Sequence, residues 1–479
     1  MATTDDRHTA EPPTAGAAST GFPWRRPRRE RIVLLLVAFA TLTPVYVVSS
    51  QDLSRLCLTR AVPAGRLTIS QCVGNGVDRA RYHGGTYSDK APGMSFLAVP
   101  AATITRLPAP AAWHFGRDLH VWSVRVLTSG VAFLILVFML GRVAEGIAAG
   151  SGGLVAVSFA LGTLAGGLAA TMFDQVTAAA LGFAAFALAW RGNPGRAGLL
   201  AGMAVTVEYQ AALIAAALAA YVLFARSDHR HRYLLGLVPG AAALALYDRA
   251  AFGSPFHVSY RYVANLYARR QHSGFFGISS PHWHTIQTVL VGDRGLLVAS
   301  PVVLAAGGGL LLLARRHRWE AATCAAVTLC YLALEFSYFL PYGGVSPGPR
   351  FLIPALPFLA LGLAPAFQRF KTISGVLALM SVLASTTLSL TWSWGSTLGY
   401  RQTVWGELIR SLTRTRSRLR YDLASNLLTW AGLSPTVCAL AVAVCACLAF
   451  ATAVHVRLSL PGGRARPRRE PEPAIESSS

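Results

Sequence analysis

Charged residues are scarce in this chain. Lys, Arg, Asp and Glu together make up 13% of its 479 residues, whereas soluble domains carry roughly 25%. Hydrophobic residues account for 53% of the sequence, and its mean hydropathy is +0.45. The composition therefore excludes an ordinary soluble protein and predicts an integral membrane protein.

Two other features are missing. No glycine-rich nucleotide-binding loop follows a predicted strand, which disfavours a cytoplasmic enzyme that uses nucleotide sugars. We also find no convincing internal repeat of the kind that many secondary transporters carry.

Acidic residues are few, and the formal net charge is +22. Such a value is typical of nucleic-acid-binding proteins, but much of this charge lies in clusters beside hydrophobic runs, at residues 25–31 and 464–469. Lys and Arg mark the cytoplasmic ends of membrane spans in this way. The predicted partner of these clusters is therefore anionic membrane lipid, and no nucleic acid is expected.

Long apolar runs predict an all-α, polytopic fold with about 12 transmembrane helices, because in lipid the backbone must satisfy its own hydrogen bonds. The candidate spans are residues 31–50, 121–141, 153–171, 176–190, 197–225, 231–248, 294–314, 319–340, 351–366, 372–393 and 433–456.

Two segments leave the topology open. In one interpretation, residues 94–107 lie on the outer surface and residues 197–225 form a helical hairpin with Glu208 at its outer tip. In the other, residues 94–107 span the membrane and residues 197–225 cross once. We favour the first, because a 14-residue run with an internal proline is a poor span and an acid at the midplane is costly.

This topology places both termini in the cytoplasm. Residues 1–30 are predicted to be a disordered basic tail, residues 31–456 the membrane domain and residues 457–479 a second basic tail. The large extracytoplasmic loops are then residues 51–120, 249–293, 341–350 and 394–432, and they hold most polar clusters of the sequence.

The cysteines fall into two groups. Five lie inside apolar runs and are expected to be small core residues. Cys57 and Cys72 both lie in the first loop. If that loop faces an oxidising space, the two can form a disulfide.

Two stretches of the first loop combine residues suited to chemistry. Asp52 follows the first span directly, and Tyr87, Asp89 and Lys90 precede a proline turn. Each stretch has a simpler interpretation, as a helix cap or a solvated turn. A Lys ammonium beside the lipid surface, however, makes a good point charge for a phosphate group.

These residues resemble the GT-C superfamily of membrane glycosyltransferases, of the protein O-mannosyltransferase and aminoarabinose transferase types. The features that carry the resemblance are an acid just after the first span and the first-loop motif Asp89-Lys90-Ala91-Pro92. The chain resembles more particularly bacterial membrane proteins with a Tyr-Ser-Asp-Lys-Ala-Pro-Gly loop. The resemblance covers about residues 31 to 370 and implies a bacterial cytoplasmic (inner) membrane protein with an extracytoplasmic active site.

The resemblance implies the transfer of a sugar from a polyprenyl-phosphate donor to a hydroxyl group of an outside glycan, lipid or protein acceptor, with inversion at the sugar. Such a reaction needs a base for the acceptor hydroxyl, for which we choose Asp52, with Asp174 as a second catalytic acid or a helix cap. It also needs positive charge at the leaving phosphate, for which Lys90 and Arg350 are the candidates. Arg350 could instead be an interface anchor.

The remaining candidates are expected to line a substrate groove. These are Tyr87, Asp89, Glu208, His257 and Tyr260. A divalent metal ion is the one cofactor that the sequence leaves open, with Asp89 and His257 as its ligands, but one acid and one distant histidine make a weak set.

Two other functions fit the same topology. A secondary transporter would also have about twelve helices, but it would place its polar residues near the midplane. A polymerase or ligase of lipid-linked saccharides would share the donor chemistry and differ in its acceptor.

Overall fold

The computed structural model describes residues 28–72, 77–107, 118–225, 230–344, 346–391, 403–406 and 426–454. Most of the two basic tails and of the loop 394–432 lies outside these residues. The predictions made for those three segments therefore stay predictions.

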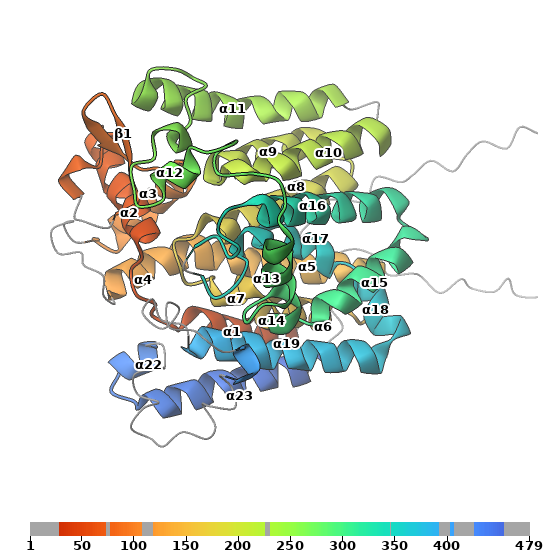
Figure 1. Cartoon of the computed structure of the whole chain (residues 1–479). Coiled ribbons are helices and arrows are strands. Elements are labelled where there is room, and N and C mark those ends of the chain that lie inside the picture. Colours follow the sequence, from red (N-terminus) through yellow and green to blue (C-terminus); the bar gives the residue numbers. More distant parts are fainter. Residues whose placement is uncertain are drawn as a thin grey trace, which may run out of the picture.

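The described part is a bundle of helices that run in roughly the same direction, with loops gathered at one end (Figure 1). This confirms the predicted all-α class. The main helices are α1 (Arg28–Leu42), α5 (Val131–Ile147), α6 (Gly152–Gly162), α8 (Asp174–Trp190), α9 (Pro194–Val207), α10 (Ala212–Ala225), α11 (Arg230–Phe252), α15 (Val302–Ala314), α16 (Arg318–Ser337), α19 (Lys371–Thr391) and α23 (Pro435–Val454).

Fewer helices are long enough to cross a bilayer than the twelve that the hydrophobic runs predict. Among the described residues, five helices have the length and composition of a span, or seven if each of two bent pairs counts as one. The difference arises because several apolar runs are interrupted. The pair Trp283–Ala299 and Val302–Ala314 bends by 85°, and Arg350–Ala360 and Leu363–Arg369 by 53°.

Residues 197–225 form the predicted hairpin. Gly198 of α9 packs against Gly236 of α11, and Gly202 against Gly240, so α9 and α11 run parallel. Since α10 connects them, it must run back. Two contacts with α16 agree with this direction. Tyr221, late in α10, donates to Glu320 near the start of α16. Tyr331, near the end of α16, donates to the carbonyl of Gln210 just before α10.

The first loop is folded rather than extended. It contains α2 (Ser50–Ala61), two short 3-10 helices (Val62–Ala64 and Ser70–Cys72), the strands β1 (Ala80–Tyr82) and β2 (Gly85–Tyr87), α3 (Gly93–Ile104) and the start of α4 (Leu119–Arg125). A disulfide joins Cys57 to Cys72, as the sequence allowed. The small hairpin of β1 and β2 was not predicted; its turn, His83-Gly84, has positive φ at both residues.

Helix α3 is too short to cross the membrane. Its 12 residues reach about 18 Å at 1.5 Å per residue, against a hydrocarbon core of about 30 Å. It packs beside α2 in the loop region (Figure 1), which agrees with the predicted surface position of residues 94–107.

Residues 253–282, here called the cover segment, connect α11 to α13 (Trp283–Val291). The segment contains η7 (Ser259–Tyr262) and α12 (Ala268–Gln271). Backbone bridges fix it to the first loop at Ala80 and Val263, and to the end of α16 at Ile278 and Tyr338. The cover segment therefore joins the two parts of the chain that frame the polar end of the bundle.

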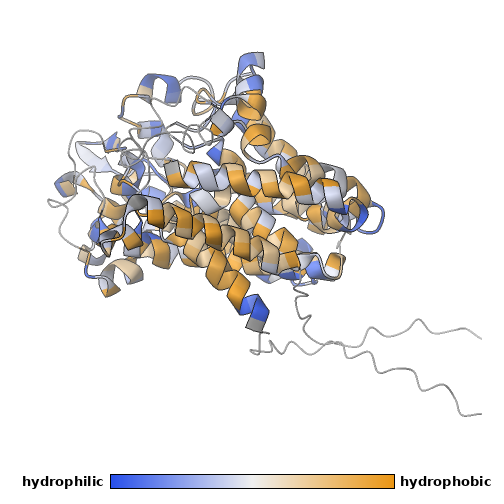
Figure 2. Ribbon diagram, turned by 90° about the horizontal axis from the view of Figure 1, so that it is seen from below, coloured by the Kyte–Doolittle hydropathy of each residue, from blue (hydrophilic) through white to orange (hydrophobic). Residues whose placement is uncertain are grey.

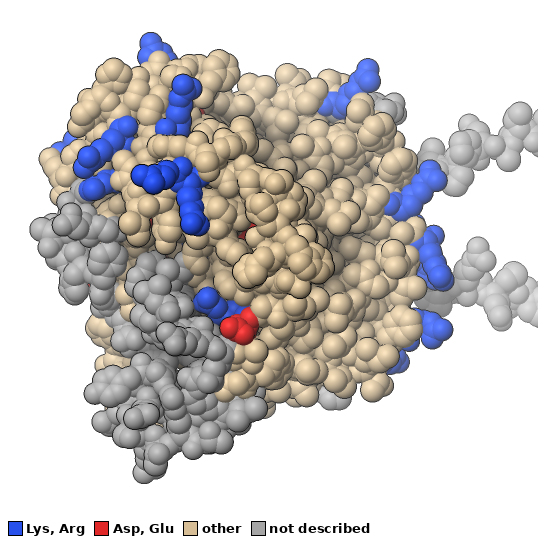
Figure 3. All heavy atoms as spheres, in the orientation of Figure 1, with Lys and Arg blue, Asp and Glu red and all other residues tan. Residues whose placement is uncertain are grey.

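The surface shows the pattern of a membrane protein. The helices of the bundle are mainly hydrophobic, whereas hydrophilic residues gather in the loops (Figure 2). On the face shown in Figure 3, basic side chains concentrate towards the two ends of the bundle, with a broad uncharged zone between them. Large apolar side chains such as Leu235, Leu246 and Leu311 are about 70% exposed along the helices. Lipid is the natural environment of this zone.

The close contact of α9 with α11 provides a test of the hairpin. A Cβ atom at Gly240 would overlap the backbone of Gly202, so Gly240→Ala should push the helices apart and destabilise the protein by about 1–3 kcal/mol. The measurement is the thermal midpoint of the purified protein in detergent. Gly307→Ala is the matched control, because this glycine of α15 has open space around its Cβ position; equal midpoints for both variants would contradict the packing.

Candidate functional site

The site begins at the amino-terminal end of α2. Ser49 caps this helix, and its hydroxyl accepts a hydrogen bond from the backbone of Asp52. In return the Asp52 carboxylate accepts from the Ser49 backbone at 2.8 Å and from its hydroxyl at 2.5 Å. This reciprocal arrangement is a capping box, and it fixes where α2 starts.

Asp52 also joins α2 to two other parts of the fold. Its Oδ2 forms an ion pair of 2.8 Å with Arg125, at the end of α4, and its Oδ1 accepts from the backbone of Met172 at 2.8 Å. Asp52 is 2% exposed and Arg125 is fully buried. Both oxygens of the carboxylate are therefore engaged by the protein itself.

One turn further along α2, Arg55 reaches the start of α8. Its Nη2 lies 2.5 Å from Oδ2 of Asp174, and both side chains are buried. Asp174 is in the first turn of α8, where the helix dipole favours a negative charge. Its other oxygen, Oδ1, is buried without a hydrogen-bond partner. Asp174 thus has a free acceptor, which Asp52 lacks.

Gln51 lies between two arginines. Arg55 donates to its side-chain oxygen at 3.3 Å. With the amide turned by 180°, that oxygen accepts from both Nη atoms of Arg350, at 2.6 and 2.5 Å. Arg350 is 5% exposed and lies over the Phe173 ring, 4.7 Å from its centroid. It is therefore an interior residue and not an anchor that reaches into the membrane interface.

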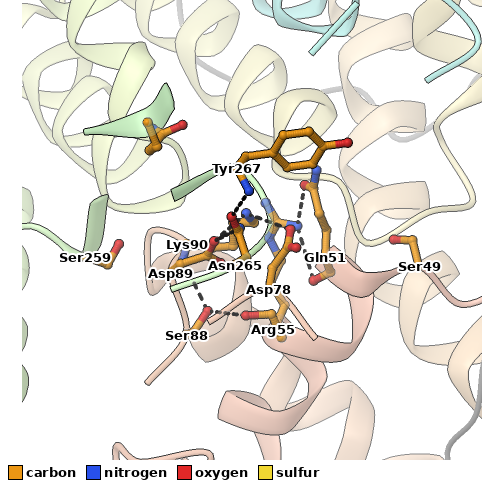
Figure 4. Close-up of polar contacts among 12 residues, drawn as sticks. Ser49, Gln51, Arg55, Asp78, Ser88, Asp89, Lys90, Ser259, Asn265 and Tyr267 are labelled. Carbon is orange, nitrogen blue, oxygen red and sulfur yellow. Dashed lines mark hydrogen bonds and ion pairs between the residues drawn. The ribbon is translucent and has the colours of Figure 1, made fainter. Parts of the chain in front are cut away.

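Lys90 belongs to a second polar group beside α2. Its ammonium lies 3.0 Å from Asp78 and 3.1 Å from Asp89 (Figure 4). Ser88, the residue before Asp89, shares a hydrogen bond of 2.9 Å with Ser54 on α2. The first-loop motif is thus attached to the same helix that carries Asp52 and Arg55.

Burial and charge set the protonation of this group. Burial, against the opposing effect of the Lys90 ammonium and with the help of the neighbouring Asp78 carboxylate, raises the pKa of Asp89 to about 6. For Lys90, burial alone would lower the pKa, but the carboxylates of Asp78 and Asp89 more than reverse this effect. Lys90 therefore stays a cation at neutral pH.

The cover segment closes over these residues. Asn265 donates to Asp89 at 3.4 Å and accepts from the Tyr267 backbone at 2.9 Å (Figure 4). Ser259 lies 3.2 Å from the Tyr209 hydroxyl, and Tyr260 packs edge-on against the Tyr209 ring at 5.0 Å. Tyr260 also lies within electrostatic range of Asp174 and Glu208.

Other predicted site residues occupy different surroundings. Glu208 is 1% exposed and accepts from Gln175 at 3.1 Å, so it lies beside Asp174 at the start of α8. Tyr87 packs against the Phe252 ring at 5.2 Å, in an aromatic cluster of the first loop.

The metal prediction gains no support from the geometry. His257 is engaged by the Tyr262 hydroxyl, 2.9 Å from its Nδ1. Within the described ranges, no group of three or more His, Cys, Asp or Glu side chains is placed to hold a metal ion. The ligand pair Asp89 and His257 stays a prediction.

Sequence reasoning missed several residues of the site, above all Arg55, Arg125, Asp78 and Asn265. One available signal was the spacing Gln51, Asp52, Arg55, which places three polar side chains on adjacent positions of a helix. That signal was lost because residues 51–120 were treated as a loop. The pairing of Arg125 with Asp52 has no local signature.

Fold comparison finds solved structures with a similar fold. The chain is similar to ArnT from Cupriavidus metallidurans, solved bound to undecaprenyl phosphate, with a TM-score of 0.51 and 15% identity over 89% of this chain and 76% of ArnT. The apo structure of the same ArnT gives a TM-score of 0.46 at 15% identity, covering 88% and 75% of the two chains.

A third similar structure is the apo oligosaccharyltransferase of Archaeoglobus fulgidus, with a TM-score of 0.38 and 12% identity over 91% of this chain and 57% of that one. No protein-family profile matches the chain, and no curated protein is similar to it in sequence. The likeness to ArnT confirms the GT-C fold that the first-loop motif suggested.

The raised pKa of Asp89 predicts a pH-dependent stability. An unfolded aspartate has a pKa near 3.8, and the folded one is about 6. Between these two pKa values, the folded protein therefore keeps a proton on Asp89 that the unfolded chain has lost. Asp89 stabilises the folded state most below about pH 4, and this contribution falls as the pH rises to about 6. Asp89→Asn, which mimics the protonated form, should gain thermal stability relative to wild type across this window.

The measurement is the difference in thermal midpoint between the two proteins from pH 4 to pH 8. Only the difference is informative, because other carboxyl groups titrate in both proteins. A difference that stays constant over this range would show that Asp89 is charged throughout.

Proposed function

We propose that this protein is a membrane glycosyltransferase that moves a sugar from a polyprenyl-phosphate donor to a hydroxyl group on the extracytoplasmic side of a bacterial inner membrane. One observation carries the proposal. The first loop and the outer ends of the helices bring buried cations and a carboxylate with a free oxygen together in a fold like that of ArnT. The ArnT structure contains undecaprenyl phosphate, which favours a polyprenyl-phosphate donor here.

Lys90 and Arg350 are the proposed phosphate ligands. Arg55 lies within electrostatic range of both, so the three cations belong to one region. Negative charge develops on the phosphate as the bond to the sugar breaks, and fixed cations in a water-poor site stabilise that charge. Gln51 and the Phe173 ring hold the Arg350 guanidinium in place for this role.

Asp174 is the better placed of the two proposed catalytic acids to act as base. A base must accept the proton of the acceptor hydroxyl within hydrogen-bond reach. Oδ1 of Asp174 is free to do so, whereas both oxygens of Asp52 already accept hydrogen bonds from the protein. Asp52 then acts as a positioning residue that fixes α2, and with it Gln51 and Arg55.

An apolar hollow next to the loop before Arg350 is the proposed path of the isoprenoid chain. It spans about 470 Å³, part of which is open to solvent, and is lined mainly by side chains of α7 (Leu164–Gly167), α14 (Leu296–Ala299), α19 and the loop before Arg350. Gly348 and Pro349 contribute to its wall. The loop that carries Arg350 therefore has the polar site on one side and this hollow on the other.

A ligase or polymerase of lipid-linked saccharides remains the second candidate, because the same donor site would serve it. A transporter is less well supported, since the buried polar residues gather at the loop end of the bundle rather than halfway along it (Figures 1 and 4).

The main test is sugar transfer from radiolabelled polyprenyl-phosphate sugars to membrane acceptors. Lys90→Ala should lower the rate about a hundredfold, since it removes charge from the leaving phosphate. Asp174→Asn should lower the rate about a hundredfold or more, because it removes the base. Lys371→Ala is the matched control, since it changes the chain's one other lysine, exposed at the start of α19.

Asp52→Asn separates positioning from catalysis. This variant leaves the buried Arg125 unpaired and should lower the thermal midpoint, with the loss of activity following the loss of folded protein. Near-normal rates for Lys90→Ala and Asp174→Asn at equal abundance would contradict the proposed roles. A stable Asp52→Asn protein without activity would return the role of base to Asp52.

The proposed orientation can be tested by cysteine labelling in intact cells. In a background without the five free cysteines, Arg269→Cys in the cover segment should react with an impermeant thiol reagent, and Arg191→Cys between α8 and α9 should be shielded. Both positions are exposed on the protein, so accessibility reports the side of the membrane. The opposite labelling pattern would place the site in the cytoplasm.

A further inference from the structure

A set of buried acceptor oxygens next to the proposed base has no partner in the protein. Glu335, in the last turn of α16, is fully buried, and neither of its carboxyl oxygens has a hydrogen bond of good geometry, although the Phe351 backbone lies close. Oε2 of Glu208, Oε1 of Gln175 and Oε1 of Gln210 are likewise buried and unpartnered. Buried polar atoms of this kind are rare and call for an explanation.

These residues come from different helices but belong to one region. Glu208 interacts electrostatically with Asp174, Arg55 and Arg350, and Glu335 interacts with Arg350 and Glu208. A hydrogen bond joins Gln175 to Glu208. Gln210 follows Glu208 by two residues, at the tip of the hairpin. The unpartnered oxygens therefore lie in the same region as the proposed base and the Arg350 guanidinium.

The chemistry of these atoms indicates what they bind. Carboxylate and amide oxygens accept hydrogen bonds, so the missing partner must be rich in donors. Hydroxyl groups supply donors without charge. A sugar carries several such hydroxyl groups on one ring, so it can supply partners to oxygens that come from different helices.

We propose that Glu208 and Glu335, assisted by Gln175 and Gln210, bind the transferred glycosyl group through its hydroxyls, and that the site takes a hydroxyl-rich sugar. This inference rests on the proposed function and adds the class of sugar and the residues that select it. Glu335 holds the sugar from the α16 side, and Glu208 holds it from the hairpin tip. The sugar thereby lies between the phosphate ligands and Asp174.

The cover segment controls access to these oxygens. Tyr260 lies within electrostatic range of Glu208, and Tyr338, which bonds Gln271 of α12 at 2.8 Å, lies within range of Glu335. The carboxyls are closed off from solvent in this arrangement. The glycosyl group therefore enters when the cover segment moves, and its hydroxyls become the partners that these carboxyls lack.

The experiment compares the binding of two lipids to the purified full-length protein. One is a polyprenyl phosphate, and the other is the same lipid phosphate carrying a neutral hexose. The wild-type protein should bind the hexose form more tightly. Glu335→Gln and Glu208→Gln should each reduce that preference about tenfold, because each replaces one carboxyl oxygen by an amide group that can only donate, and should leave binding of the bare phosphate unchanged.

Glu320→Gln is the matched control. It makes the same substitution at the opposite end of α16, where Glu320 accepts from Tyr221, and it should leave both affinities unchanged. Glu335→Asp keeps the charge and shortens the side chain, so a variant that folds as wild type but also loses the preference supports direct contact with the sugar.

The outcomes separate the two proposals. If neither lipid binds the wild-type protein, the proposed donor is wrong. If both lipids bind, and the glutamate variants keep the wild-type preference for the hexose, the donor stands and the sugar site is wrong. A third lipid, carrying a deoxy sugar, tests the hydroxyls: binding as tight as that of the hexose form would overturn their role as the groups that the glutamates bind.

Discussion

The ion pair between Asp52 and Arg125 is the interaction on which the site depends. It connects the start of α2 to the end of α4, and through the Met172 backbone to the turn before α8. Two charges buried together are stable only while both are present, since removing either leaves the other without an opposite charge. The capping box of Ser49 and Asp52 sets where α2 begins, and the ion pair holds that end of the helix against α4. The positions of Gln51 and Arg55 follow from this placement.

The same helix then serves both polar groups of the site. Arg55 pairs with Asp174 on α8, and Ser54 bonds to Ser88 beside the Asp89 and Lys90 motif. Residues far apart in the sequence are thereby held against one short element. The bundle supplies the rigid frame, and α2 places the first-loop side chains against the ends of its helices.

The sequence predicted the membrane class, the all-α fold and the hairpin at Glu208, because these follow from hydrophobic length and the cost of a midplane acid. Hydropathy alone did not predict how many runs would be broken. The bend between α14 and α15 falls at Pro301, a residue type that interrupts helices. Lys90 and Arg350 were identified from local motifs. Arg55 and Arg125 were not, because their partners lie on other helices and a single sequence does not record such contacts.

The disulfide between Cys57 and Cys72 has a consequence for how the protein matures. It closes a loop of 15 residues at the end of the helix that carries Asp52 and Arg55, and a cross-link of this kind limits the conformations open to an unfolded chain. Thiols stay reduced in the cytoplasm and pair after export. In the proposed orientation, a chain inserted the opposite way round would keep these two thiols in the cytoplasm and would lack the disulfide. Only correctly inserted molecules would therefore gain the stability that the cross-link provides.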